Sequence, residues 1–200
     1  MRLILGEFHL ESEGVRADWG RRPFSAGLDF RGQGKHDQYR LELPCPAAWS
    51  AEKLFQWAVE EVMAYHIFPP SRMRALVDAP QGWVVKGATI LQGVFVGSFR
   101  LRMADRVLEV FEGEDANERW SGFTYGTLKG HAEQGIETFR VTLEKASGRV
   151  QFSMEAWSKP GHWLIQLFYP WARWVQKKAG EEAMQYMKDR LDEMIKKEKS

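Results

Sequence analysis

Residues 123–139 read Phe-Thr-Tyr-Gly-Thr-Leu-Lys-Gly-His-Ala-Glu-Gln-Gly-Ile-Glu-Thr-Phe and carry the clearest strand-and-turn pattern of the chain. Two β-prone runs, 120–128 and 136–143, flank a loop in this stretch. Glycine punctuates the runs and the loop at Gly126, Gly130 and Gly135. Strand-like runs joined by a glycine-containing loop are typical of an antiparallel β-hairpin. The stretch therefore predicts such a hairpin.

One face of the predicted hairpin changes from apolar to polar along its length. Side chains of a strand alternate between its two faces, so residues two apart share a face. A loop centred near Ala132 predicts four pairs on one face: Ser121 with Leu143, Phe123 with Val141, Tyr125 with Phe139, and Thr127 with Glu137. The end near the loop would therefore carry Tyr125, Thr127 and Glu137 in phase with core residues.

Glu137 has two interpretations, because a carboxylate in phase with a core needs a partner or a wet cavity. In the first, Glu137 lies at the mouth of its strand, reaches water or a backbone N–H, and stabilises the turn, as expected for a residue type that is rarely fully buried. In the second, it forms the polar end of an internal ligand pocket with Tyr125 and Thr127. A register slip of one residue would move Thr127 and Glu137 to the solvent side.

Length and charge argue against several classes of protein. The 200 residues suit one domain with a sizeable core. With 28 basic and 27 acidic residues the net charge is +1, so no strong field favours nucleic acid or an anionic membrane. The single cysteine, Cys45, precludes an intramolecular disulfide and suits a reducing compartment. Without a membrane-length apolar run or a signal-peptide core, the chain is expected to be cytoplasmic, with no stable membrane insertion.

The first part of the chain divides into two expected units. Residues 1–37, with two glycine-containing turns, are expected to form an N-terminal appendage of short strands or partly mobile chain. Residues 38–200 are expected to form a single domain. It begins with a half-buried strand at 39–43, in which apolar and polar residues alternate. Ser50 is then expected to cap a helix that Pro69 and Pro70 stop, before a short second helix at 73–77.

The middle of the chain is expected to be β throughout. Turn residues separate the apolar runs, which cover 83–85, 89–96, 98–103, 107–111, the hairpin, and 149–157. In the last run, Val150, Phe152 and Met154 alternate with polar residues. One side of the sheet would therefore meet a core and the other would meet water.

The C-terminal segment is expected to cover the apolar side of that sheet. Trp163, Leu167, Trp171, Trp174 and Val175 form an apolar stripe at helical spacing. Such a stripe is ordinary core in most proteins and otherwise lines a pocket, which makes Trp163 and Trp171 pocket candidates. Ser158 would cap the helix, and Pro170 would kink or break it near Tyr169 before it continues to about Ile195.

This α+β order resembles the helix-grip fold of the START and pollen-allergen-like (SRPBCC) superfamily, in which a curved antiparallel sheet wraps around a long C-terminal helix. More narrowly, Tyr-Gly-Thr-Leu-Lys-Gly-His at 125–131, Glu133, Gly135, Glu137, and Trp-Ser-Lys-Pro at 157–160 resemble the domain-of-unknown-function family numbered nineteen-ninety. The resemblance runs from about Pro46 to Met187. It implies binding of lipids, sterols or other hydrophobic small molecules, sometimes with cyclase or hydrolase activity, and it transfers no catalytic residues.

Candidates for other chemistry are weak. His131 and Glu133 would share a strand face and, with Glu137, could be read as a metal-binding or acid–base cluster. Zinc sites usually recruit three or four well-placed ligands, and the loop glycines favour His131 as a hairpin residue that bonds to nearby backbone. The chain has no Gly-x-Ser-x-Gly elbow and no glycine-rich run before Lys-Ser or Lys-Thr. We therefore expect neither a metal nor a cofactor.

Three functional hypotheses remain. In the first, the protein binds a hydrophobic small molecule or lipid between the sheet and the C-terminal helix. Tyr125, Thr127 and Glu137 would orient a polar group of this ligand, and Phe123, Phe139, Trp163 and Trp171 would surround the rest. In the second, a cyclase- or hydrolase-type enzyme uses the same pocket, with Glu137 or His131 as general acid or base. In the third, the cavity is filled and the protein is a structural or partner-binding module. The sequence favours a binding protein over an enzyme and leaves the oligomeric state open.

Overall fold

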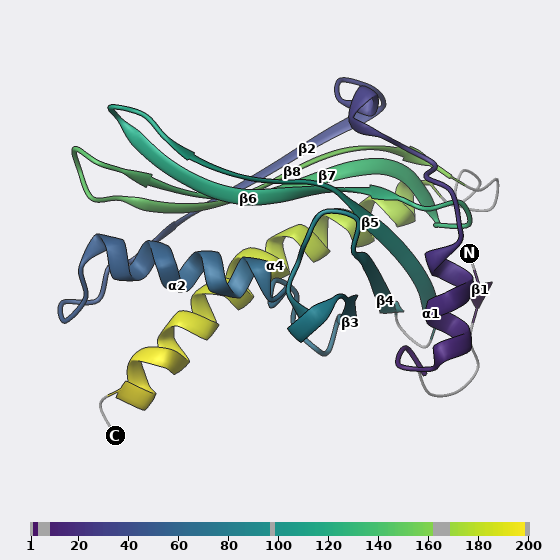
Figure 1. Cartoon of the computed structure of the whole chain (residues 1–200), viewed down its shortest axis with the longest axis horizontal. Coiled ribbons are helices and arrows are strands. Elements are labelled where there is room, and N and C mark those ends of the chain that lie inside the picture. Colours follow the sequence, from purple (N-terminus) through teal and green to yellow (C-terminus); the bar gives the residue numbers. More distant parts are fainter. Residues whose placement is uncertain (1, 4–8, 97–98, 162–168, 199–200) are drawn as a thin grey trace.

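The computed structural model describes residues 2–3, 9–96, 99–161 and 169–198. Figure 1 shows a long, curved sheet with two helices, α2 and α4, on one side of it. The strands are β1 (Arg2–Leu3), β2 (Lys35–Leu43), β3 (Met73–Asp78), β4 (Thr89–Val96), β5 (Phe99–Glu114), β6 (Glu118–Thr127), β7 (Glu133–Glu144) and β8 (Val150–Pro160). The helices are α1 (Glu13–Gly20), α2 (Ala51–Met63) and α4 (Tyr169–Glu198), with short 3₁₀ turns at Leu28–Phe30 and Pro80–Gly82.

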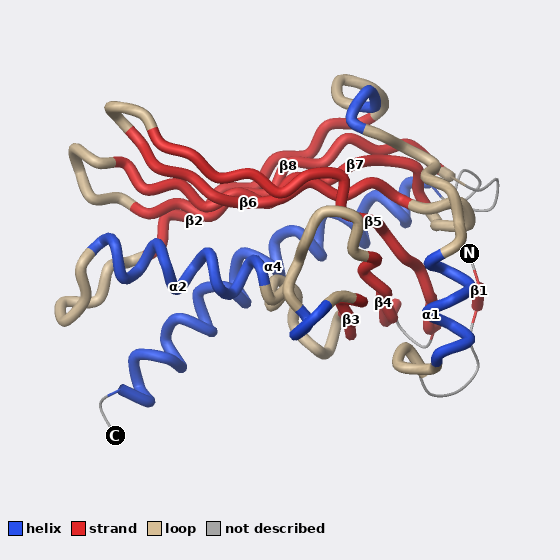
Figure 2. The backbone as a smooth tube through the Cα atoms, in the orientation of Figure 1, coloured by secondary structure: helices blue, strands red, loops and turns tan. Residues whose placement is uncertain are grey.

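The strands form one antiparallel sheet in the order β2-β8-β7-β6-β5-β4-β3, and β1 pairs with β5. Figure 2 shows the sheet running as a continuous layer over α2 and α4. The last helix, α4, therefore packs along the inner face of a curved sheet. This arrangement confirms the expected α+β, helix-grip fold class.

The main core lies between the inner face of the sheet and the two helices. Ser50 caps α2 as expected: its hydroxyl accepts a hydrogen bond from the Lys53 backbone N–H at 3.1 Å. Helix α2 then buries residues at helical spacing, among them Leu54, Ala58 and Val62. The side of α4 that faces the core carries Ala183, Met187 and Leu191, one residue per turn and each 0 % exposed. These buried apolar side chains pack α4 into the main core.

The segment before β2 packs on the other face of the sheet. Trp19 of α1 is 2 % exposed and clusters with Leu91, Ala104 and Leu128. The Arg106 guanidinium, on β5, donates hydrogen bonds to the carbonyl oxygens of Trp19 and Gly20. Strand β2 begins at Lys35, three residues before the boundary expected at residue 38.

Three expectations for the middle of the chain were wrong. Residues 73–78 form β3 instead of a short helix, because β4 offers a free edge with which they pair from Met73–Val94 to Asp78–Thr89. Residues 83–85 lie in a loop and not in a strand. The expected strands 98–103 and 107–111 are one strand, β5, with a register shift between Val107 and Glu109. Such a bulge bends a strand without ending it.

The C-terminal expectations also need correction. Ser158 caps no helix; it lies in β8, which continues to Pro160 and pairs with β2 and β7. Helix α4 begins at Tyr169, with Pro170 as its second residue, where a missing N–H costs no helix hydrogen bond. Trp171 and Trp174 are 49 % and 58 % exposed, so they do not form a buried stripe. Trp163 and Leu167 lie outside the described residues.

Candidate functional site

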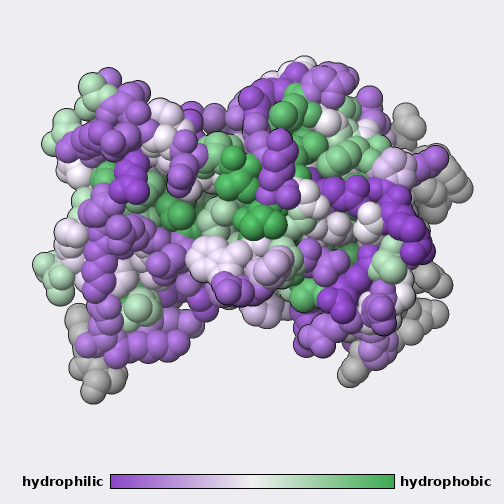
Figure 3. All heavy atoms as spheres, viewed as in Figure 1, coloured by the Kyte–Doolittle hydropathy of each residue, from purple (hydrophilic) through white to green (hydrophobic). Residues whose placement is uncertain are grey.

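A cavity of about 200 Å³ lies between the inner face of the sheet and the first half of α4. Its apolar wall is formed by Phe68, Met73, Val94, Met103, Met154 and Val175. The rest of its lining is unusually rich in carboxyl groups, which come from β2, β5 and β7. Figure 3 shows hydrophobic residues gathered in the hollow at the middle of one face of the molecule, between two hydrophilic ends.

Strand register brings the polar residues of the cavity together. Tyr125 on β6 lies opposite Glu137 on β7, Glu137 lies opposite Ala156 on β8, and Ala156 lies opposite Asp37 on β2. These four residues form one row across four strands. Because the sheet is antiparallel, side chains directly opposite each other point to the same face. The row therefore lines the cavity.

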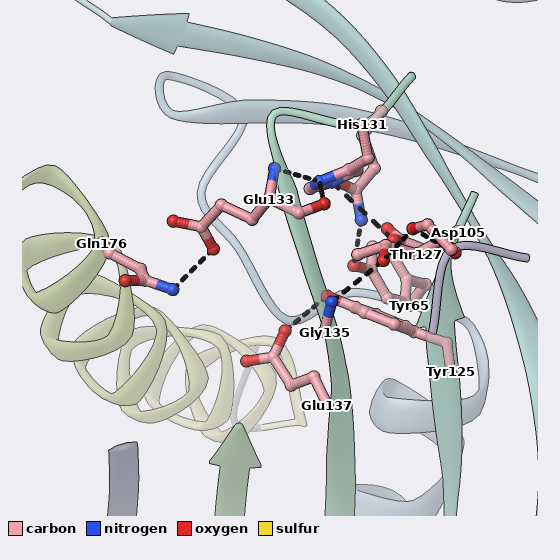
Figure 4. A network of polar contacts seen from close by, with 11 residues as sticks. Tyr65, Asp105, Tyr125, Thr127, His131, Glu133, Gly135, Glu137 and Gln176 are labelled. Atoms are coloured by element: carbon pink, nitrogen blue, oxygen red, sulfur yellow. Dashed lines mark hydrogen bonds and ion pairs between the residues drawn. The ribbon is translucent and has the colours of Figure 1, made fainter. Parts of the chain in front are cut away.

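A second row lies beside the first, nearer to the hairpin loop. Asp105 on β5 is opposite Thr127 on β6. The Thr127 hydroxyl accepts a hydrogen bond of 3.0 Å from the Gly135 backbone N–H and lies 2.7 Å from the hydroxyl of Ser25. Figure 4 shows Asp105, Thr127, Tyr65 and Tyr125 on one side of the site, with Glu133 and Gln176 facing them.

Tyr125 and Glu137 form a hydrogen bond in which the phenol donates to the carboxylate Oε2. Burial raises the pKa of Glu137 to about 7, although the hydrogen bond from Tyr125 opposes this shift. Burial and the nearby charge of Glu137 hold the pKa of Tyr125 well above its usual value. Tyr125 therefore remains a hydrogen-bond donor at every physiological pH.

Behind this pair, the ring of Tyr65 packs against Tyr125, with ring centroids 6.5 Å apart. The Gln92 amide donates a hydrogen bond of 2.8 Å to the Tyr65 hydroxyl. Burial and the charge of Asp105 raise the pKa of Tyr65. Tyr125 thus lines the site as a neutral phenol, and Tyr65 supports it from behind through aromatic packing.

Asp105 is the least compensated group in the site. It is 0 % exposed, and neither carboxyl oxygen has a hydrogen-bond partner within the part of the chain that the structure describes. The His131 Nε2 lies 3.7 Å from Oδ1. Burial lowers the pKa of His131 to about 4, so this imidazole is neutral at physiological pH. Burial and the charges of Glu137 and Glu133 raise the pKa of Asp105 well above its usual value.

Helix α4 supplies the opposite wall through a chain of polar contacts. The Gln176 amide donates hydrogen bonds to the Glu133 carboxylate at 2.7 Å and to the Ser158 hydroxyl at 3.0 Å. The Gln176 carbonyl accepts from Arg173 at 2.6 Å. Arg173 is itself bidentate on Asp37, at 2.5 and 2.6 Å. These hydrogen bonds and the ion pair hold α4 against β2 and β7 at the edge of the cavity.

Glu133 shares the electrostatic character of Glu137. Burial raises its pKa to about 7, with a further contribution from the charge of Glu137. Two carboxyls with pKa values near neutrality, and a third that is raised, can exchange protons at physiological pH. Among the described residues, no group of three or more His, Cys, Asp or Glu side chains is arranged to hold a metal ion.

The expected site residues fall into three groups. The residues that line the cavity are Tyr125, Thr127, His131, Glu133, Glu137 and Trp171. Phe123 and Phe139 do not line it; both are 0 % exposed and stack on each other in the core, with ring centroids 5.0 Å apart. Trp163 lies outside the described residues. His131 also bonds to nearby backbone, because its Nδ1 accepts from the Glu133 N–H at 3.0 Å.

The hairpin register differs from the predicted one by two residues. Tyr125 is paired with Glu137 rather than with Phe139, and Phe123 is paired with Phe139 rather than with Val141. The loop is centred near His131, one residue before Ala132. A shift of two residues keeps every side chain on its expected face, whereas a shift of one would have reversed it. The inward direction of Thr127 and Glu137 survives for this reason.

Sequence reasoning missed several polar residues that line the site, among them Asp37, Asp105 and Gln176, and also Tyr65 behind it. Asp105 was missed because a charged residue between two apolar runs is typical of a turn. Asp37 fell in the expected appendage, and Gln176 was one of many polar residues on a helix. A strand alternation carried through 99–107 would have placed Asp105 in phase with Met103 and Val107, on the core side.

Solved structures similar to this chain include a hypothetical protein from Helicobacter pylori. The two share 8 % sequence identity at a TM-score of 0.48, over 77 % of this chain and 88 % of that one. Norcoclaurine synthase from Thalictrum flavum, solved with dopamine and hydroxybenzaldehyde, shares 12 % identity at a TM-score of 0.46. That match covers 84 % of this chain and 93 % of the synthase.

No helix within the described ranges is long and apolar enough to cross a membrane.

Relatives by sequence carry no assigned activity in their names. A UPF0548 protein from Dictyostelium discoideum is 36 % identical over 91 residues, which cover 42 % of this chain. The match spans 41 % of the length of that relative. The family model described as "Domain of unknown function (DUF1990)" matches residues 32–186, a range that includes β2, the hairpin, every lining carboxyl and most of α4. This protein belongs to the DUF1990 family.

Proposed function

We propose that this protein binds a small hydrophobic molecule in the cavity between the sheet and α4. The observation that supports this most directly is the cavity itself: about 200 Å³ of space, with an apolar wall and a few converging polar groups. An engineered apolar cavity of about 150 Å³ is large enough to bind benzene. The occupant is therefore about the size of one substituted ring, smaller than a sterol or a full fatty acid.

Tyr125, Thr127 and Glu137 would contact the polar group of the ligand, and Trp171 would cover it from α4. His131 and Glu133 are secondary contacts at the same end of the cavity. Phe123 and Phe139 would support the floor without touching the ligand. Burial of a polar ligand group in such a site is favourable only when protein groups satisfy its hydrogen bonds, and this requirement gives specificity.

A second candidate is an acid–base enzyme of the cyclase or hydrolase type in the same cavity. One observation favours it: Glu137 has a pKa of about 7 and bonds to Tyr125. A carboxyl with that pKa can take up or give a proton near neutral pH, and a neutral phenol can donate to a developing oxyanion. Activity of this kind would fall in Glu137→Gln while binding of the substrate persists.

The first test is native mass spectrometry of the freshly purified protein, followed by analysis of an organic extract. A bound molecule of one-ring size supports the binding function. Because a weakly held molecule is lost during purification, the second step is a ligand titration monitored by NMR with benzyl alcohol and p-cresol. We expect shifts at residues that line the cavity and saturable binding.

The matched variants are Ala156→Leu and Ala146→Leu. Ala156 lines the cavity, so a leucine there fills part of it and should weaken binding at least tenfold. Ala146 is exposed in the turn between β7 and β8, so a leucine there should leave binding unchanged. Equal binding by both variants would contradict the proposal.

A further inference from the structure

Three carboxyl groups that line the cavity, Asp105, Glu133 and Glu137, form no ion pair with a lysine or arginine among the residues that the structure describes, although the charge of Arg173 lowers the pKa of Glu133. The two guanidinium groups at its edge are already engaged. Arg72 is bidentate on Glu182, with both contacts at 2.6 Å, and Arg173 is bidentate on Asp37. The imbalance of charge therefore belongs to the inner part of the cavity and not to its rim.

The environment of Asp105 provides a second, independent indication of this imbalance. Asp105 is fully buried, it lines the cavity, and neither of its oxygens has a hydrogen bond to any residue that the structure describes. Leaving a buried polar group unsatisfied costs about 1–3 kcal/mol, and more when the group is charged. A ligand that donates to Asp105 would remove this penalty on binding. The carboxyl thus identifies where the polar end of the ligand sits.

The polar groups around the cavity offer acceptors and few free donors. The Tyr125 hydrogen is used on Glu137, and the Gln176 amide donates to Glu133 and Ser158. Thr127 already accepts from Gly135 and shares a hydrogen with Ser25. A complementary ligand must therefore bring hydrogen donors, and a positive charge would match the carboxyls.

We propose that the ligand is a primary amine, bound as its ammonium cation, with an apolar body about the size of one ring. An ammonium group has three hydrogen donors and no acceptor, which matches the three carboxyl groups once they are ionised. Asp105, Glu133 and Glu137 would receive those hydrogens, and Met103, Met154 and Val175 would contact the ring. This inference rests on the proposed binding function and specifies its ligand class.

Binding of the cation should release protons. Glu133 and Glu137 have pKa values near 7, and that of Asp105 is raised, so the empty cavity holds protons at and below neutral pH. An ammonium ion stabilises the charged carboxylates and lowers these pKa values. The other titratable or charged groups around the site are Asp37 and Tyr39 of β2, Tyr65 and Arg72 of the segment between α2 and β3, Tyr125 of β6, His131 of the hairpin loop, and Arg173 of α4.

The test is calorimetry with benzylamine, benzyl alcohol and benzoate, which share a ring and differ in charge. At pH 8 we expect benzylamine to bind at least tenfold more tightly than benzyl alcohol, and benzoate to bind least. The benzylamine affinity should fall at least tenfold between pH 8 and pH 5. The binding enthalpy of benzylamine should depend on the ionisation enthalpy of the buffer, with the sign that indicates release of protons to the buffer. The binding enthalpy of benzyl alcohol should be the same in every buffer.

Variants assign the effect to the cavity. Asp105→Asn should reduce benzylamine affinity at least tenfold and leave benzyl alcohol affinity unchanged, and Glu133→Gln provides a second variant if the first does not fold. Glu112→Gln, an exposed residue on the same strand as Asp105, is the matched control and should bind like the parent. Binding of benzyl alcohol at least as tight as that of benzylamine would overturn the amine proposal and leave the binding function standing. Absence of binding by every probe would overturn both.

Discussion

The ring of Tyr39, on β2, lies directly against Gly180 of α4. A Cβ at position 180 would lie within 2.8 Å of three carbons of the Tyr39 ring, so the ring or the helix would have to shift to make room for it. Glycine usually weakens a helix, by roughly 0.5–1 kcal/mol relative to alanine. Here its missing side chain lets α4 approach the sheet beside the cavity.

Gly180→Ala should therefore destabilise the protein, although alanine is the better helix former. We expect a loss of about 1–3 kcal/mol in the free energy of unfolding, the usual cost of overpacking. Gly20→Ala is the matched control, because a Cβ at position 20 of α1 meets nothing within 4 Å. Urea denaturation of both variants measures the difference, and a stabilised Gly180→Ala protein would contradict this account of the helix contact.

Tyr125→Phe should raise the pKa of Glu137. The hydrogen bond from the phenol favours the charged carboxylate, so its removal leaves burial to act alone. A ¹³C NMR titration of the glutamate side chains measures the change, which we expect to exceed half a pH unit. Tyr186→Phe, on the C-terminal half of α4, serves as the control and should leave the Glu137 titration in place.

Stability should fall as pH rises from about 4.5 to about 7. Glu133 and Glu137 have folded-state pKa values raised from 4.5 to about 7, so in this window the folded state holds more protons than the unfolded state. A group of this kind stabilises the fold at low pH and loses that contribution as it ionises. Each can lower the free energy of unfolding by at most about 1.4 kcal/mol per pH unit.

Chemical denaturation at pH 5 and pH 8 measures this trend. Glu137→Gln should flatten the profile, and Glu112→Gln should leave it unchanged because the Glu112 side chain is exposed and does not line the cavity. Carboxylates that are paired in the folded state produce the opposite slope. Since Glu182 is paired with Arg72 and has a lowered pKa, the comparison is best made as a difference between each variant and the parent.

Trp19→Ala should destabilise the whole sheet. Trp19 is 2 % exposed against Leu91, Ala104 and Leu128, and truncation of a buried tryptophan typically costs about 3–5 kcal/mol. Trp174→Ala is the matched control: Trp174 is 58 % exposed, so we expect a change within about 0.5 kcal/mol. These two variants also test the expected domain boundary after residue 37. If residues 1–37 were an independent appendage, Trp19→Ala would not change the unfolding of residues 38–200.

Much of the fold follows from local pattern. Alternating apolar residues predicted β2, β4, the hairpin and β8, and the cap at Ser50 predicted where α2 begins. The residues of β3 were misread because a six-residue run carries no decisive period, and only the edge of β4 makes it a strand. Similarly, Ser158 has the chemistry of a helix cap, yet pairing with β2 and β7 extends the strand through it.

The sequence alone predicts which residues of the hairpin share its inward face, because side chains an even number of residues apart point to the same side of a strand. This alternation places Tyr125, Thr127 and Glu137 on one face. Tertiary structure alone decided that Asp105 joins them. A charged residue in a strand is locally unfavourable, and only the ladders from β4 and β6 carry β5 through it and turn its carboxyl into the cavity. The acidic character of the site is thus a property of strand pairing, which no local pattern specifies.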